Sequence, residues 1–395
     1  MNARTSFARA ALALAALACA TATHAQSAAP SVTVRADNSL GIARTSETVT
    51  VPWAELQRRL GAATAANVRV VDAEGREIPS QVVDDDGDGT LDALIFQGDW
   101  SPMESRHFVI QAAAPSRRYA PLVAVRHDPP RDDMAWENDR TAYRIYGEGL
   151  KKTSSAMSSN GIDVWMKSTR ALIVEKWYAK GHDAYHVDTG EGADFYDVGE
   201  TLGNGGTAGW ARDTIWRGDN FKQWRIIASG PIRATFELRY DPWTVAGSTM
   251  SERKIISIDA GQNLYRATSI FTSPNGGNIP YVIGEVKRPG MTATMSRANA
   301  WAWLAAWGPV APKNGGHGEL GTAVLLKRDA LSDWKESNDH YLAVSHATSG
   351  HPVVHYIGSA WTANGDFPTP QSWWHYLDAM AQRIESPIKV TLETR

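Results

Sequence analysis

The chain has 395 residues, with 40 basic and 43 acidic side chains and a formal net charge of −3 at pH 7 when histidine is neutral. This balance provides no basic face for nucleic acid, and the length suits one large domain or one large and one small domain. The single cysteine, Cys19, excludes a disulfide within the chain, so the fold must rely on its core.

The first 25 residues have the pattern of a secretory signal peptide. Arg4 and Arg9 precede an apolar run over residues 10–20, and small residues lead to a cleavage position before Gln26. Without this segment the net charge becomes about −5. We therefore expect a periplasmic or secreted protein.

Two membrane-bound alternatives are less favoured. The apolar run is too short to span a bilayer, and no later segment reaches ~20 consecutive apolar residues. A lipoprotein would carry its lipid on Cys19, but Ala16 stands where a bulky aliphatic residue is usual. We therefore expect a soluble product without a membrane span.

Short alternating runs rich in β-branched and aromatic residues dominate the rest of the chain, with Gly, Pro, Asn and Asp between them. Helical spacing occurs in two segments only, residues 53–60 and 370–384. We therefore predict a mostly antiparallel β fold. The predicted strands are 31–34, 48–51, 67–71, 107–111, 141–146, 171–178, 224–228, 232–240, 254–258, 265–271, 323–327, 341–345, 353–356 and 388–393.

A segment rich in proline and arginine, residues 114–133, predicts a domain boundary near residue 125. Residues 1–25 would be the signal peptide, and residues 26–125 a small N-terminal β unit with an acidic turn. Residues 126–395 contain more predicted strands than a seven-stranded sandwich needs, which indicates a large two-sheet β-sandwich as the candidate catalytic domain.

The acidic turn resembles a calcium loop, in which alternate carboxylates converge on one ion and a glycine allows the sharp bend. It lacks the downstream bidentate glutamate, so an ordinary acidic hairpin turn is the alternative. In either case its role is structural, and no cofactor is required for activity. The candidate metal ligands are Asp84, Asp86, Asp88 and Asp92.

Within residues 136–147, a group of polar side chains is followed directly by an alternating strand pattern. Asn138, Arg140 and Tyr143 could reach a ligand from the sheet, because arginine suits bidentate recognition of a carboxylate. The alternative is that Arg140 pairs with a neighbouring acid, Glu137 or Asp139, to close the loop.

Residues 185–210 have neither helical nor strand periodicity and contain many glycines and acids. Loops of this length are commonly functional, and a surface Ω-loop is the alternative. Tyr185 and His186 form a plausible acid and base, since histidine titrates near neutrality. A metal site on His182 and His186 is a further alternative. The acids that surround them are Asp183, Asp188, Glu191 and Asp194.

The chain contains 16 Trp and 12 Tyr. Tryptophan suits stacking on sugar rings, and Trp210 and Trp216 with Arg217 could form a saccharide platform, although β-sandwiches also use tryptophan in cores and edges. The sequence has no GxSxG, P-loop, GxGxxG or HExxH motif, which argues against serine hydrolases, kinases, dinucleotide enzymes and common zinc proteases.

With these motifs, the chain resembles a family of exported bacterial proteins, long labelled as of unknown function, found beside polysaccharide lyases and unsaturated uronyl hydrolases. The similar segments are the acidic turn, residues 136–140, 161–165 and 256–261, and the loop from Tyr185. The resemblance implies a galactose-mutarotase-like supersandwich and an activity similar to that of an oligosaccharide dehydratase acting on ulvan fragments. The implied partner is an oligosaccharide.

Dehydration of a terminal uronate removes the C5 proton and expels the C4 hydroxyl, so the enzyme needs a base, an acid and a group that neutralises the carboxylate. On chemical grounds Arg140 with Asn138 would meet the carboxylate, His186 would be the base, and Tyr185 or Tyr143 the acid. A glycoside hydrolase is the alternative enzyme, with two flanking carboxylates from Glu137, Asp188, Glu191 and Asp194. A sugar-binding protein without catalysis is the other alternative.

Overall fold

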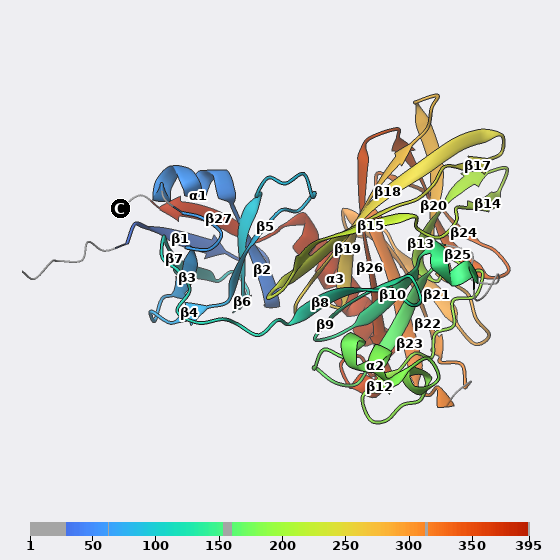
Figure 1. Ribbon diagram of the computed structural model, residues 1–395, viewed down its shortest axis with the longest axis horizontal. Helices are drawn as coiled ribbons and strands as arrows, with labels where there is room; N and C mark the ends of the chain where they lie inside the picture. The colour runs from blue at the N-terminus through green and yellow to red at the C-terminus, as the bar shows by residue number, and fades with distance from the viewer. Residues whose placement is uncertain (1–28, 62, 153–159, 313–314, 394–395) are drawn as a thin grey trace, which may run out of the picture.

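The computed structural model describes residues 29–61, 63–152, 160–312 and 315–393. The predicted signal peptide lies outside these residues. The fold is mostly β, with several antiparallel sheets and three α-helices in the described residues, which confirms the predicted fold class. Figure 1 shows a small N-terminal lobe beside a larger main lobe.

The N-terminal lobe consists of two antiparallel sheets, with strand orders β27-β1-β7-β3-β4 and β2-β6-β5. Helix α1 packs beside them, and their apolar side chains share one core that includes Val34, Leu56 and Phe108. The elements are β1 (Ser31–Asp37), β2 (Arg44–Pro52), α1 (Trp53–Leu60), β3 (Arg69–Asp72), β4 (Glu77–Ile78), β5 (Ser80–Val83), β6 (Ala93–Trp100), β7 (Ser105–Gln111) and β27 (Lys389–Glu393).

The main lobe begins with a five-stranded sheet of order β12-β11-β10-β9-β8. A second five-stranded sheet has the order β14-β13-β20-β25-β24. The strands are β8 (Val123–Asp128), β9 (Asp133–Asn138), β10 (Ala142–Tyr146), β11 (Ile162–Lys167), β12 (Gly192–Ala193), β13 (Asn204–Ala211), β14 (Thr214–Arg217), β20 (Asn278–Val286), β24 (Leu331–Glu336) and β25 (His340–Thr348).

A nine-stranded sheet of order β15-β16-β18-β19-β26-β23-β22-β21, with β17 paired to β18, completes the main lobe. One continuous core, which includes Trp136, Ile283, Leu304 and Ile357, joins this sheet to the two five-stranded sheets. The strands are β15 (Gln223–Ser229), β16 (Arg233–Arg239), β17 (Trp243–Val245), β18 (Ser248–Asp259), β19 (Leu264–Thr272), β21 (Thr292–Ser296), β22 (Trp301–Pro309), β23 (Glu319–Lys327) and β26 (Pro352–Trp361).

Helix α3 (Pro370–Glu385) covers the nine-stranded sheet on its other side. Thr369 and Ser372 form a reciprocal capping box, and Pro370 occupies the first turn, where its missing N–H costs nothing. Trp373 and Leu377 of the helix pack in one apolar cluster with tryptophans of β22. The predicted C-terminal helix is therefore present, with helical limits within one residue of expectation.

The last strand does not stay in the main lobe. β27 pairs antiparallel with β1, with Val34 opposite Leu392, and so completes a sheet of the N-terminal lobe. The predicted boundary at residue 125 falls inside β8, whose partner β9 belongs to the main lobe.

The strand predicted over residues 171–178 is wrong, because this segment forms helix α2 (Val174–Lys180). The carboxylate of Glu137 accepts hydrogen bonds from the N–H groups of Ile173 and Val174, at 2.8 to 2.9 Å, and thereby caps the helix from a distant strand. The local periodicity of residues 171–178 does not indicate this cap, because Glu137 lies outside the segment. Several buried strands, including β20 and β22, were also absent from the predicted set because their apolar runs alternate weakly.

No helix in the described part of the chain is both long and apolar enough to cross a membrane.

Candidate active site

A cavity of about 670 Å³ is lined by β10, by the short 3₁₀ helix η3 (Ala184–His186) and by the segment that follows β12. Its volume lies within the range of ligand-binding pockets, roughly 300 to 1,000 Å³. Val187, Phe195 and Val198 provide apolar wall. The polar lining includes Arg144, Tyr146, His182, His186, Asp194 and Asp197.

Arg144 is the centre of a buried ionic network. Its Nε and Nη2 donate to Asp163 Oδ2 at 3.0 and 2.6 Å, and Nη2 also donates to Asp194 Oδ2 at 2.7 Å. Tyr146 donates its hydroxyl proton to Asp163 at 3.0 Å. Asp133 Oδ2 lies 3.8 Å from Arg144 Nη1. One guanidinium therefore organises three carboxylates drawn from β9, β11 and the segment after β12.

The network shifts the proton affinities of its members. Burial lowers the pKa of Arg144, but Tyr146, Asp163 and Asp194 outweigh this effect and raise it overall. Burial raises the pKa of Asp133 to about 7 and, together with the charge of Asp163, raises the pKa of Asp194. Three buried carboxylates around one cation repel one another when all are ionised, which costs free energy. At least one of them therefore retains its proton near neutral pH.

His186 presents a defined tautomer to the cavity. Its Nδ1 lies 2.7 Å from the backbone carbonyl oxygen of Asp194, and a carbonyl can only accept, so Nδ1 carries the proton. In the neutral ring Nε2 is then the unprotonated nitrogen. Burial lowers the pKa of His186 below its usual value, which favours this neutral form near pH 7. Within the described residues no hydrogen bond occupies Nε2.

Tyr185 forms part of the structure behind the cavity. It is buried, its ring packs against Trp165 with centroids 5.0 Å apart, and its hydroxyl accepts a hydrogen bond from Arg144 Nη1 at 2.9 Å. Burial raises the pKa of Tyr185. Its position indicates that Tyr185 orients Arg144, and it does not line the cavity with His186.

Arg140 and Asn138 lie elsewhere. Arg140 Nη1 binds Asp366 at 3.1 Å, and its Nε lies 3.6 Å from Asp139, so the predicted closure by Asp139 is present. The side-chain amide of Asn138 donates to the carbonyls of Asp259 and Gln262 at 2.6 and 2.7 Å and organises a buried turn. Neither residue lines the cavity around His186.

Tyr143 is fully buried in the core of the main lobe. Its hydroxyl lies 3.0 Å from Ser359 Oγ, and burial raises its pKa. The direction of β10 explains the difference from expectation. Successive side chains of a strand point to opposite faces of the sheet. Tyr143 therefore points into the sandwich core, whereas Arg144 and Tyr146 point to the other face and line the cavity. Tyr143 therefore has no route to a ligand in this cavity.

The predicted saccharide platform is only partly assembled. Trp210 and Arg217 line a second cavity of about 340 Å³ together with Lys335 and His340. Trp216 lies on β14 next to Arg217, and its indole N–H donates to the carbonyl of Ala211 at 3.1 Å. No lining residue is shared between this cavity and the cavity around His186.

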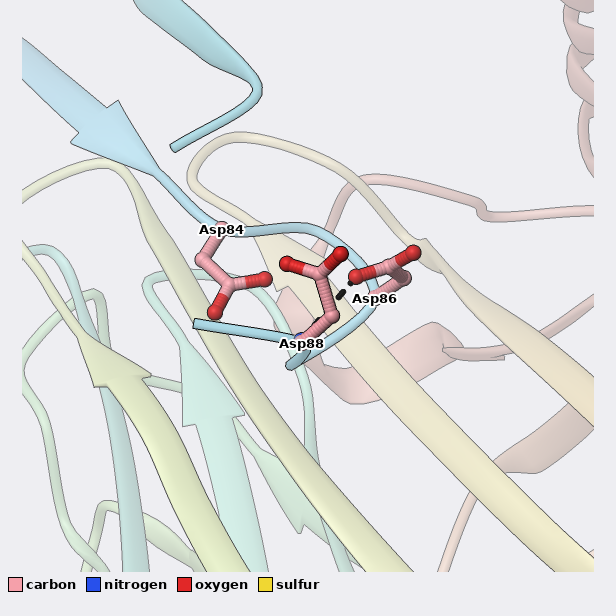
Figure 2. Close-up of side chains that lie close together, drawn as sticks. All are labelled: Asp84, Asp86 and Asp88. Atoms are coloured by element: carbon pink, nitrogen blue, oxygen red, sulfur yellow. Dashed lines mark hydrogen bonds between the residues drawn. The ribbon is translucent and has the colours of Figure 1, made fainter. Parts of the chain in front are cut away.

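The acidic turn brings three of its four predicted ligands together. Oxygen atoms of Asp84, Asp86 and Asp88 all lie within 4.8 Å of one another, as Figure 2 shows. Asp92 instead accepts a hydrogen bond from the N–H of Asp85 at 2.6 Å. An all-oxygen donor set fits calcium, and Gly87 with φ 73° makes the bend that the loop needs.

The hydrolase hypothesis and the metal-site hypothesis name acids and histidines that do not all lie in one site. Glu137 forms a buried ion pair with Lys167 at 2.9 Å, and Glu191 binds the exposed Lys176 at 2.5 Å. Of the four hydrolase candidates, only Asp194 lines the cavity. The rings of His182 and His186 lie in a tilted contact with centroids 4.9 Å apart, but in the part of the chain that the structure describes they belong to no three-ligand metal group.

Sequence reasoning missed Arg144, Tyr146 and Asp163 as members of a site. A usable signal existed, because Asp133, Arg144 and Asp163 each stand beside apolar residues in a strand whose residues are all buried. Charged residues are almost never fully buried without a partner, so three such interruptions in adjacent strands predict a buried ion network.

The family model described as "Domain of unknown function (DUF4861)" matches residues 36–390. A protein from Formosa agariphila, described as "Uncharacterized protein P7", is 29% identical over 375 residues, which cover 90% of this chain and 92% of that protein.

Two solved structures from Enterococcus faecalis are similar to this chain at low sequence identity. The first, described as a protein in the Glycosyl Hydrolase Family 38, has a TM-score of 0.50 and 10% identity. The matched region covers 93% of this chain and 48% of that protein's chain. The second, described as an alpha-mannosidase, has a TM-score of 0.47 and 9% identity and covers 93% and 46%. The chain thus spans about half the length of these structures, and the first likeness shows similarity of fold alone.

Proposed function

The chain belongs to the DUF4861 family, and from the cavity around His186 we propose that it is an exported carbohydrate-active enzyme that eliminates water from the terminal uronate of oligosaccharides. The observation that carries the proposal is the tautomer of His186. A backbone carbonyl holds the proton on Nδ1 at 2.7 Å, so Nε2 is available as a base in a pocket of about 670 Å³.

Asp194 supports the acid half of the reaction. It lines the same cavity, and burial with the nearby charge of Asp163 raises its pKa. A carboxyl that keeps its proton near neutral pH can protonate a departing hydroxyl. Asp194 thus holds His186 through its backbone and would act as acid through its side chain, in the place that the sequence-based hypothesis gave to a tyrosine.

The proposed reaction is balanced. Nε2 of His186 takes the proton from C5, the electron pair of that bond forms the C4–C5 double bond, and the C4–O bond breaks. Asp194 gives its proton to the leaving oxygen, so water departs and one unsaturated uronate remains. Proton transfer from His186 to Asp194, directly or through solvent, restores both groups. Arg144, with His182 at the rim, would face the substrate carboxylate.

Incubation of the purified protein with uronate oligosaccharides tests the proposal. Mass spectrometry should show loss of one water without chain shortening, and ultraviolet absorbance should rise as the double bond conjugates with the carboxylate. Unchanged mass and absorbance across gluco-, galacto- and mannuronate oligosaccharides, for protein shown to be folded, would contradict a dehydratase.

One observation favours a second candidate, a glycoside hydrolase. Asp194 and Asp197 both line the cavity, and the raised pKa of Asp194 is the property that a glycosidase acid requires. A hydrolase would add one water, shorten the chain and leave the absorbance unchanged. A protein that only binds sugar would change neither mass nor absorbance, although titration calorimetry would detect the complex.

A further inference from the structure

A separate cavity of about 140 Å³ lies where the N-terminal lobe, the nine-stranded sheet and α3 meet. Glu47 of β2 lines it from the N-terminal lobe, and Arg383 of α3 lines it from the helix. Two further arginines, Arg233 and Arg266, line it from the sheet. The cavity is therefore bordered by three guanidinium groups.

Two of the three arginines are neutralised by carboxylates. Arg233 donates from Nε and Nη2 to the two oxygens of Asp259, at 2.6 and 2.7 Å, and from Nη1 to Asp85 at 2.8 Å. Arg383 Nε donates to Glu47 at 2.5 Å. No ion pair to Arg266 occurs among the residues that the structure describes. Since Asp259 and Glu47 are already engaged, Arg266 is the guanidinium of this cavity that has no carboxylate partner within the described residues.

Hydroxyl donors stand beside this charge. Arg266 of β19 is the direct cross-strand partner of Ser257 on β18 and of Tyr356 on β26, and all three side chains line the cavity. Ser257 is 9% exposed, and in the described structure its hydroxyl has no hydrogen-bond partner. The Ser257 hydroxyl can therefore donate to an acceptor placed in the cavity.

We propose that this cavity binds one small tetrahedral oxyanion, sulfate or inorganic phosphate. Arg266 would supply charge-assisted hydrogen bonds, and the Ser257 and Tyr356 hydroxyls would complete the donor set. The site lies between rigid strands that fix its donors. A cavity of about 140 Å³ exceeds the ~10 to 15 Å³ that one water needs, but it is small for a sugar ring.

The proposed site lies at the junction of the two lobes, because Glu47 and Thr48 of the N-terminal lobe border the same cavity as Arg266. This inference is independent of the proposed enzymatic function, since the two cavities share no lining residue.

Calorimetric titration and thermal unfolding of the whole protein in sulfate, phosphate or chloride at matched ionic strength test the site. Arg266→Met removes the free charge, and Arg297→Met, at an exposed arginine outside the cavity, is the matched control. We expect saturable binding of sulfate or phosphate to the wild type and to Arg297→Met, and at least about tenfold weaker binding to Arg266→Met.

Sulfate also stabilises proteins by exclusion from their surfaces, so a rise in Tm alone does not identify a site. Equal affinities in the three proteins, or no saturable binding to the wild type, would overturn the proposal. If Arg266→Met does not fold, Ser257→Ala removes a single neutral donor and should weaken the affinity about threefold to tenfold. An unchanged affinity of Ser257→Ala would then overturn it. The ratio of sulfate to phosphate affinity identifies the preferred anion.

Discussion

Arg144 and Asp163 are direct cross-strand partners on β10 and β11, and the guanidinium donates twice to one carboxylate oxygen, at 3.0 and 2.6 Å. The backbone pairing of two strands therefore sets the ion pair. Asp194 joins the pair from a loop at 2.7 Å and brings its carbonyl to His186. The loop that holds the proposed base is thus connected to a rigid sheet.

Replacement of Arg144 by Met should lower the free energy of unfolding by about 3 to 5 kcal/mol, because it leaves the carboxylate of Asp163 buried without a cation and Asp194 without its hydrogen-bond donor. Urea unfolding followed by circular dichroism measures the loss. The exposed Arg328→Met is the control and should change stability by at most about 0.5 kcal/mol. Adding Asp163→Asn to the Arg144 variant should recover part of the loss. Equal unfolding of the two single variants would contradict a stabilising network.

Asp133 should make the folded protein less stable as the pH rises. Its pKa is raised to about 7 by burial, against 3.8 as the ordinary value, so the folded state holds the proton that the unfolded state releases. The stabilisation is fully present below the unfolded pKa and is lost as the pH passes through 7. Between about pH 5 and pH 8, wild type should lose about 3 kcal/mol relative to Asp133→Asn. The exposed Asp329→Asn should follow wild type, and parallel curves for wild type and Asp133→Asn would refute the shift.

His186→Ala should reduce kcat by about 10² to 10⁴-fold while substrate affinity remains within a few fold, because in the proposed reaction the histidine takes the proton from C5. The exposed His351→Ala is the matched control and should keep wild-type rates. Since burial lowers the pKa of His186, the acidic limb of the wild-type rate profile should lie below the ordinary histidine value of 6.5. A variant that retains more than about a tenth of the rate would exclude His186 as the base.

The double variant Asp86→Asn with Asp88→Asn should have a lower Tm than wild type in calcium, whereas turnover of the folded fraction should not change. Calcium that binds the folded turn stabilises by mass action, and removal of two of the three converging carboxylates weakens that binding. Thermal unfolding with calcium and with a chelator measures the effect. If wild type unfolds at the same temperature in both, the turn is an acidic hairpin without a metal.

Trp210→Ala should weaken saccharide affinity by about 1 kcal/mol if its ring stacks on sugar in the cavity of about 340 Å³. Turnover at saturating substrate should stay within about twofold, since this cavity and that of His186 are lined by different residues. Trp224→Ala, at a tryptophan that is 42% exposed, is the control. A large fall in Tm would show instead that Trp210 covers the apolar cluster beneath it.

Local signals explain which parts of the fold were predictable. The C-terminal helix was predicted because its periodicity lies within one segment, where Pro370 also marks its start. The loop predicted over residues 185–210 is present in its first part, which contributes His186 and Asp194 to the cavity, whereas residues 204–210 belong to strand β13. In both cases the residues that determine the feature are neighbours in sequence.

Long-range contacts explain the misses. Helix α2 depends on Glu137, which lies 36 residues before Ile173, so its local pattern of β-branched and aromatic residues predicted a strand. On β10 the sequence indicates no strand register, so the sequence-based hypothesis names Tyr143 and does not include Arg144. The direct pairing of Arg144 with Asp163 decides between these neighbours, and it becomes visible only when β10 and β11 are aligned.

The pairing of β27 with β1 affects how the chain is made. The first sheet to leave the ribosome cannot obtain its outermost strand until residues 389–393 have followed. During synthesis, β1 therefore presents an open backbone edge, the kind of surface on which strands of other chains add. A nascent chain would need to keep this edge covered, by a chaperone or by continued extension, until its last strand arrives.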